Sequence, residues 1–161
     1  AELGAKKRQN ADFEHFIFSY HGLPERQIRK GDAIGKCLTG NCCETLHPDN
    51  KLCYRAQCFA TSRKLAEVMQ LSENQYTVCF QSRLGKDPWI QPYTEDVILD
   101  LTKKGIKNVL AFSPAFTSDC LETTVEVSSR RARHVEIRDN HHWLSSLRHP
   151  RESQRSSHPC Y

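Results

Sequence analysis

Apolar positions along the chain form short blocks that predict β-strands. The run Phe13–Ser19 is short and rich in aromatic residues, which favours a buried strand, and Gly22 and Pro24 end it. Two further blocks, residues 76–81 (YTVCFQ) and 108–112 (NVLAF), are predicted as the second and third strands.

Apolar residues at helical spacing predict helices after these strands. Residues 54–69 form the first helix, beyond a cysteine-dense loop. The second begins at Thr94, a favourable N-cap residue, and ends at Gly105. A third helix is expected to start at Ser118 or Asp119 and to continue through residue 127.

The alternation of strands and helices predicts an α/β fold, in which parallel strands are joined by right-handed crossovers. Ligands of such Rossmann-like sheets bind at the carboxyl edge of the strands. His21 lies at the end of the first strand and therefore at this edge. Its position is equally compatible with a ligand-binding histidine and with a turn residue that satisfies local hydrogen bonds.

The length, hydropathy and charge of the chain limit the kinds of protein to which it can belong. A chain of 161 residues is long enough for one domain with its own core. It has no apolar run long enough to cross a bilayer and no signal-peptide pattern, so we expect a cytoplasmic or membrane-peripheral protein. Charges cancel over residues 1–127, and the formal net charge of +4 comes entirely from residues 128–161.

Residues 128–161 differ in composition from the rest of the chain. They hold 7 Arg and no Lys, with five of the eight histidines, and no apolar stripe continues into them. We interpret this tail as a frameshifted or otherwise aberrant, disordered end, or alternatively as a basic tail that contacts anionic lipid. Few aromatic residues lie between the arginines, which disfavours a nucleic-acid partner.

Three motifs resemble the ferrochelatases, which insert ferrous iron into a porphyrin to make haem. They are residues 19–24 (SYHGLP), 81–94 (QSRLGKDPWIQPYT) and 112–123 (FSPAFTSDCLET), in family order. The resemblance covers about residues 10–127 and corresponds to the second half of such an enzyme. It implies a chelatase lobe over residues 1–127, with a cysteine-rich insertion at 37–58, and a second, similar lobe upstream.

The resemblance also implies roles for individual residues. His21 and Glu122 would be catalytic, and His21, Glu122 and Glu126 would contact the metal. The alternative for Glu122 is position N3 of the third helix, where a glutamate supports the helix start. One turn beyond Glu126, where the family continues its acidic series, the chain has Arg130.

Further residues of the motifs are expected to bind the porphyrin: Tyr20, Ser82, Arg83 and Trp89. Arg83 would pair with a porphyrin propionate or, equally, with a carboxylate of the protein that holds the loop. Trp89 would line an apolar wall for the macrocycle or pack the loop onto the following helix.

Eight cysteines are many for a chain without a secretory signal, which favours metal binding over disulfides. Five of them have the spacing C-x4-C-C-x9-C-x4-C: Cys37, Cys42, Cys43, Cys53 and Cys58. Because some ferrochelatases carry a [2Fe–2S] cluster, we expect four of these thiols to hold one, with Cys42 or Cys43 left over. Zn²⁺ and a set of free thiols are the alternatives.

Other functions remain open at this point. They are a related chelatase for another metal or tetrapyrrole, a non-catalytic iron–sulfur or zinc module that needs only the cysteines, and a fragment that is inactive without its second lobe.

Overall fold

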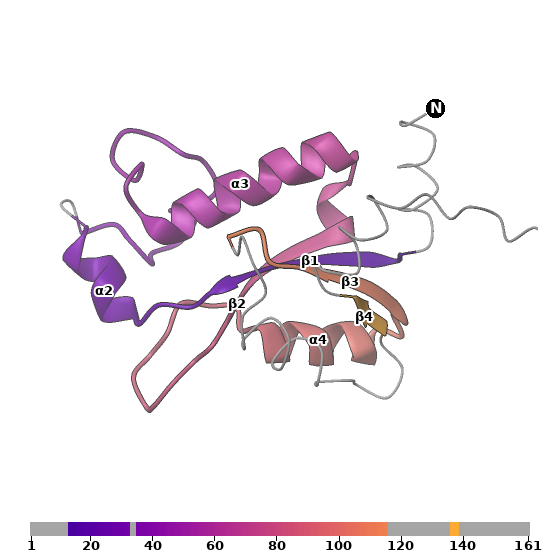
Figure 1. Ribbon diagram of the computed structural model, residues 1–161. Coiled ribbons are helices and arrows are strands. Elements are labelled where there is room, and N and C mark those ends of the chain that lie inside the picture. Colours follow the sequence, from indigo (N-terminus) through magenta and orange to yellow (C-terminus); the bar gives the residue numbers. More distant parts are fainter. Residues whose placement is uncertain (1–12, 33–34, 116–135, 139–161) are drawn as a thin grey trace, which may run out of the picture.

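The computed structural model describes residues 13–32, 35–115 and 136–138, and these contain one parallel sheet (Figure 1). Its strand order is β2-β1-β3-β4. The four strands are β1 (His15–His21), β2 (Tyr76–Gln81), β3 (Asn108–Phe112) and β4 (Glu136–Arg138). All three pairings are parallel. The predicted parallel α/β architecture is therefore confirmed, and so is the position of His21 at the carboxyl end of the first strand, which spans His15–His21 and not residues 13–19.

The helices lie on both faces of the sheet. α3 (Tyr54–Met69) covers one face and α4 (Thr94–Lys103) covers the other (Figure 1). The bounds of α3 are those predicted. A short helix that the sequence analysis missed, α2 (Glu25–Lys30), follows β1, and a 3₁₀ turn at Glu73–Gln75 precedes β2.

The alternation of side chains along β1 divides the core between the two faces. Ile17 packs beneath α4, and Phe18 and Tyr20 pack beneath α3. The α4 side is a cluster of Ile17, Cys79, Val97, Ile98, Leu101, Val109 and Ala111. The α3 side is a cluster of Phe18, Tyr20, Ile28, Cys37, Cys58, Ala66, Val78, Phe80 and Ile90. Helix α4 is amphipathic, so its apolar stripe fits the first cluster as predicted.

Two details of the elements differ from the predictions. Tyr93, not Thr94, is the N-cap residue of α4, because the Thr94 hydroxyl points into the core and contacts Ser19 and Cys79 instead. Strand β4 lies in the tail from which no further strand was predicted. Its residues pair with β3 in the register Asn108–Glu136. The predicted third helix lies outside the described residues.

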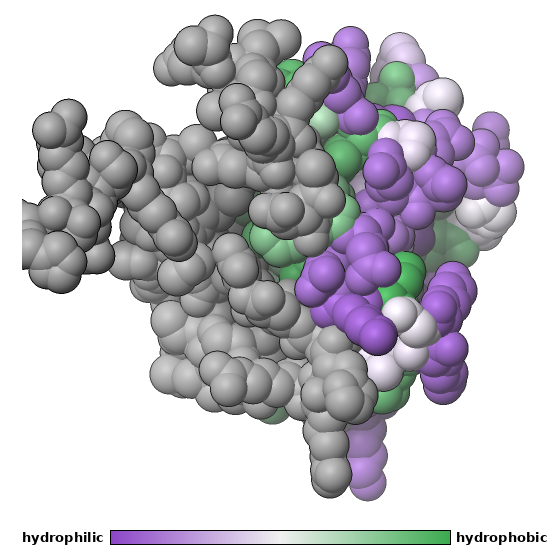
Figure 2. All heavy atoms as spheres, turned by 90° about the vertical axis from the view of Figure 1, so that its right-hand side faces the viewer, coloured by the Kyte–Doolittle hydropathy of each residue, from purple (hydrophilic) through white to green (hydrophobic). Residues whose placement is uncertain are grey.

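None of the described helices is long and apolar enough to cross a bilayer. Figure 2 shows the face at the amino ends of the strands, where the described side chains are mainly hydrophilic with smaller hydrophobic areas between them. The predicted site lies at the opposite end of the sheet, where the strands point.

Candidate active site

The site begins with the histidine at the carboxyl end of β1. His21 is partly buried, and its Nδ1 atom lies 2.6 Å from the carbonyl oxygen of Gly22. A carbonyl oxygen only accepts hydrogen bonds, so Nδ1 must carry the proton in this contact. In the neutral imidazole, Nε2 then has a free lone pair. Histidines that bind metals in proteins are commonly held in this way by a backbone carbonyl.

Gly22 allows the two motif loops to approach each other. Its N–H donates to the carbonyl oxygen of Gln81 at 2.8 Å, which extends the β1–β2 pairing by one residue. A Cβ atom at this position would lie 2.8 Å from the same oxygen and 3.1 Å from Cε3 of Trp89. Only glycine therefore fits between the end of β2 and the indole ring.

The loop after β2 is tied to the segment after β1. The N–H of Glu25 donates to the carbonyl of Pro88 at 2.9 Å, and the N–H of Ile90 donates to the carbonyl of Leu23 at 3.0 Å. These bonds place the Trp89 ring with its centroid 6.5 Å from that of His21. The first two motifs thus meet at the carboxyl edge of the sheet.

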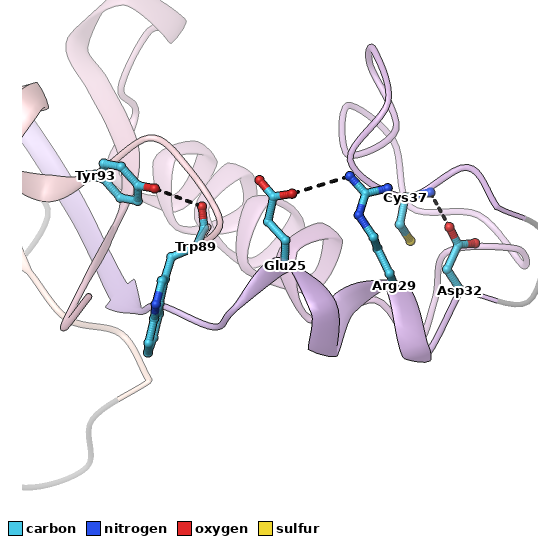
Figure 3. Close-up of polar contacts among 6 residues, drawn as sticks. All are labelled: Glu25, Arg29, Asp32, Cys37, Trp89 and Tyr93. Atoms are coloured by element: carbon cyan, nitrogen blue, oxygen red, sulfur yellow. Dashed lines mark hydrogen bonds and ion pairs between the residues drawn. The ribbon is translucent and has the colours of Figure 1, made fainter. Parts of the chain in front are cut away.

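Trp89 is itself anchored by its neighbours in the loop. Its indole N–H donates to the carbonyl of Leu84 at 2.9 Å. Figure 3 shows the Tyr93 hydroxyl directed at the backbone carbonyl of Trp89, to which it donates at 3.2 Å. The tryptophan is half-buried, so part of its surface stays exposed while the rest packs in the loop.

Ser82 and Arg83 follow the last residue of β2. Ser82 has a φ of 67°, a left-handed conformation that is uncommon for residues other than glycine and recurs at functional sites. The guanidinium of Arg83 lies 4.7 Å from the ring centroid of Tyr93. Arg83 thus makes a cation–π contact within the loop, and its pairing with a porphyrin propionate or with a carboxylate of the protein stays a prediction.

Tyr20 precedes His21 in β1, but its side chain lies on the α3 side of the sheet. Its side chain is 3% exposed, packs with Phe80, and shares a hydrogen bond of 2.9 Å with the Ser62 hydroxyl on α3. Burial raises the pKa of its phenol to about 12. Neighbouring residues of a strand point to opposite faces, so Tyr20 faces away from His21, and the structure gives no support for its predicted substrate contact.

A buried polar network lies beneath the site, on the α4 side of the sheet. The Ser19 hydroxyl donates to Oε1 of Gln81 at 2.9 Å and lies 3.1 Å from the Thr94 hydroxyl, which contacts Cys79 at 3.2 Å. Gln81 is 5% exposed, and its Nε2 is the one buried side-chain N or O atom without a partner among the described residues. The buried amide N–H groups of Gln81 thus lack an acceptor among the described residues.

The other residues predicted to take part in the reaction belong to the third motif or follow it. Its first residues, Phe112–Ala115, leave β3 at the same edge of the sheet. Glu122 and Glu126 lie outside the described residues, so their position relative to His21 stays a prediction.

The cysteine loop packs between α2 and α3. Asp32 accepts a hydrogen bond of 2.6 Å from the N–H of Cys37 (Figure 3). The Asn50 carboxamide donates to the carbonyls of Cys42 and Thr45 at 2.7 and 2.8 Å. These side chains order the loop around a cavity of about 160 Å³, which Cys37 and Cys42 line with His47 and Asp49.

The five candidate thiols are neighbours but do not form a ready metal site. Cys37 contacts Cys53, and the Sγ atoms of Cys42 and Cys43 lie 3.5 Å apart. Burial raises the pKa of Cys37 and Cys58 to about 12 and that of Cys43 to about 11. Within the described part of the chain, no three histidine, cysteine, aspartate or glutamate side chains stand where they could hold one ion.

Tyr54 is a residue of the site that the sequence analysis missed. It is the first residue of α3, and its hydroxyl donates to the carbonyl oxygen of His21 at 2.9 Å. The two residues are 33 positions apart. A contact of this range leaves no trace in local periodicity or spacing.

Comparison with known proteins supports the family that the three motifs indicate. The family described as Ferrochelatase matches residues 2–145. A ferrochelatase of Legionella pneumophila is 49% identical over 116 residues, which are 72% of this chain and 34% of that protein. A ferrochelatase of Coxiella burnetii is 48% identical over 118 residues, 73% of this chain and 33% of that protein.

Two consequences follow from these matches. The chain spans about a third of the length of the curated relatives it matches. The family match also continues past residue 127, where the sequence analysis ended the resemblance, and it includes strand β4. The origin of the remaining tail stays a prediction. By the extent of the family match and the identity to these relatives, the chain belongs to the ferrochelatase family.

Proposed function

We propose that the full-length protein is a lyase that inserts Fe²⁺ into a porphyrin, protoporphyrin IX, to form haem. The observation that carries the proposal is the contact between Nδ1 of His21 and the Gly22 carbonyl, which leaves the Nε2 lone pair of His21 free at the carboxyl edge of the sheet. Membership of the ferrochelatase family supports the same reaction.

Metal insertion has three chemical requirements. Two pyrrole N–H protons must leave the ring, Fe²⁺ must lose its bound water, and the ring must bend so that its nitrogen lone pairs face the metal. A neutral imidazole with a free Nε2 can accept a proton or bind Fe²⁺, because its ordinary pKa lies near 6.5. His21 is the described residue that offers such a lone pair at this edge.

A carboxylate is needed opposite the imidazole, to take the second proton or to guide the ion. We assign this role to Glu122, and we assign Glu126, one helical turn further along, to the path of the metal. Both roles follow from the third motif. Replacing Glu122 by Gln keeps the shape of the side chain and removes its charge, so haem formation should fall about 100-fold or more.

The loop after β2 supplies the proposed porphyrin contacts. Trp89 would lie against the macrocycle, since its half-buried ring stands next to His21. Ser82 and Arg83 leave the same strand end, and the exposed guanidinium of Arg83 can exchange its contact with Tyr93 for a propionate. Tyr20 is left out of this set because it is buried.

The proposal also concerns the second lobe and the location of the full-length protein. A second lobe, outside this chain, would close the porphyrin cleft, since the chain covers about a third of its relatives. We place the enzyme in the cytoplasm. If its arginine-rich end is natural and not frameshifted, we propose that this end contacts anionic lipid. Sedimentation with anionic vesicles, compared with neutral ones, tests that contact.

We also propose that the cysteine loop binds a [2Fe–2S] cluster, with Zn²⁺ as the alternative. The support is that five thiols lie close together between α2 and α3, although the loop would have to rearrange before four of them reached one centre. Absorption and electron paramagnetic resonance spectra of anaerobically purified protein test this. A colourless protein without iron, inorganic sulfide or zinc would contradict it.

The decisive experiment is an anaerobic assay of the full-length gene product with Fe²⁺ and protoporphyrin. Haem should form, and the isolated 161 residues should form little or none, because half of the cleft is absent. Formation of only a zinc or cobalt porphyrin would favour a related chelatase, and no metalation at all would favour a non-catalytic metal-binding module.

A further inference from the structure

The hydroxyl of Tyr54 reaches the backbone of the site from helix α3. It donates to the carbonyl oxygen of His21 at 2.9 Å, across 33 positions of sequence. Helix α3 lies on the opposite face of the sheet from α4 (Figure 1). The contact therefore joins the covering helix to the last residue of β1, at the point where that strand ends.

The carbonyl that Tyr54 contacts belongs to the peptide unit between His21 and Gly22. The N–H of the same unit donates to the Gln81 carbonyl at 2.8 Å. Because a peptide unit is planar, bonds at both of its ends fix the rotation of the whole plane. Gly22 has no side chain that would restrain its backbone, so this restraint has to come from outside.

The orientation of this peptide determines where the imidazole is held. It precedes the Gly22 carbonyl, which lies 2.6 Å from Nδ1 of His21. A rotation of the plane would move that carbonyl and with it the ring. The Tyr54 hydroxyl thus acts on the direction of the Nε2 lone pair without touching the imidazole.

We infer that Tyr54 is a positioning residue, which orients His21 through the His21–Gly22 peptide. The inference rests on the proposed function of His21. Nothing in it requires Tyr54 to touch a substrate.

The test compares Tyr54→Phe with Ser62→Ala in the full-length gene product. Each removes one hydroxyl that forms a hydrogen bond between α3 and β1, but the Ser62 hydroxyl contacts Tyr20 and not His21. Turnover is expressed per porphyrin-binding site, counted by quenching of porphyrin fluorescence. Tyr54→Phe should lower kcat about fivefold, as expected for one neutral hydrogen bond, with an unchanged Kd for metal-free protoporphyrin. Ser62→Ala should keep kcat within about twofold at a similar loss of Tm.

A measurement independent of turnover separates this inference from the proposed function. In protein labelled with ¹⁵N-histidine, the ring nitrogen signals of His21 should shift in Tyr54→Phe and stay in place in Ser62→Ala. Unchanged signals in Tyr54→Phe would overturn the inference even if the wild type makes haem. If the signals shift in Tyr54→Phe but the wild type forms no haem, the inference is supported and the proposed reaction is contradicted.

Discussion

The Nδ1 atom of His21 and the carbonyl oxygen of Gly22, its neighbour in sequence, are 2.6 Å apart. This contact selects one neutral tautomer of the imidazole, and it does so with backbone atoms alone. The reactive nitrogen is thereby set by the turn that ends β1.

Replacing His21 by Asn separates the two nitrogens of the ring. The Asn side-chain amide keeps an N–H near the position of Nδ1 but has no basic nitrogen in place of Nε2. Turnover of Fe²⁺ and protoporphyrin should therefore fall about 100-fold or more, while Tm stays close to that of the wild type. Wild-type turnover in this variant would contradict the role of Nε2.

Gly22→Ala tests the close approach between the two loops. The new Cβ would lie 2.8 Å from the Gln81 carbonyl oxygen, so the free energy of unfolding should fall by about 1–3 kcal/mol in urea denaturation. Gly31→Ala is the matched control, because its nearest atom would be 3.7 Å away and its φ is −87°. Equal stability of the two variants would show that the loops separate without cost.

Ser19→Ala tests the buried network below the site. It would leave Oε1 of Gln81 without its donor, in addition to the unpartnered Nε2, so we expect a loss of about 1–3 kcal/mol of unfolding free energy. Gln81→Met removes both orphaned atoms, and the double variant should be more stable than the sum of the single changes predicts. Strict additivity in chemical denaturation would exclude this coupling.

Stability at alkaline pH should report the buried thiol of Cys79. Burial raises its pKa from 9.0 to about 12, and the thiol is fully buried. The stability that comes from this shift is complete below pH 9 and is lost as the pH rises toward 12, at about 1.4 kcal/mol per pH unit. Urea denaturation under reducing conditions should therefore show a shallower alkaline decline for Cys79→Ala than for the wild type. Parallel curves would mean that the thiol does not titrate in this range.

Much of the fold could be predicted from local pattern. The strand-helix alternation gave the parallel sheet, and the bounds of α3 were correct, because apolar periodicity and turn residues act locally. The prediction for Thr94 as the N-cap residue was wrong, since bonds to Ser19 and Cys79 compete with the capping geometry. Helix α2 was missed because it is short and buries only Ile28.

The site was predicted less completely. The motif placed His21 correctly at the strand end, but it also suggested Tyr20 as a substrate contact, which its buried position does not support. The period of two along a strand would have separated Tyr20 from His21, because it puts them on opposite faces. Tyr54 could not have been found in this way, since its contact with His21 depends on how α3 packs across the sheet.

Strand β4 changes what counts as the end of the lobe. Its three residues belong to the arginine-rich tail, residues 128–161, and they pair with the outer edge of β3. Protein cut after residue 127 would lose this cover and present the unpaired N–H and C=O groups of β3 to solvent. Such an open edge recruits strands from other molecules, so the shortened lobe should self-associate where the longer one does not.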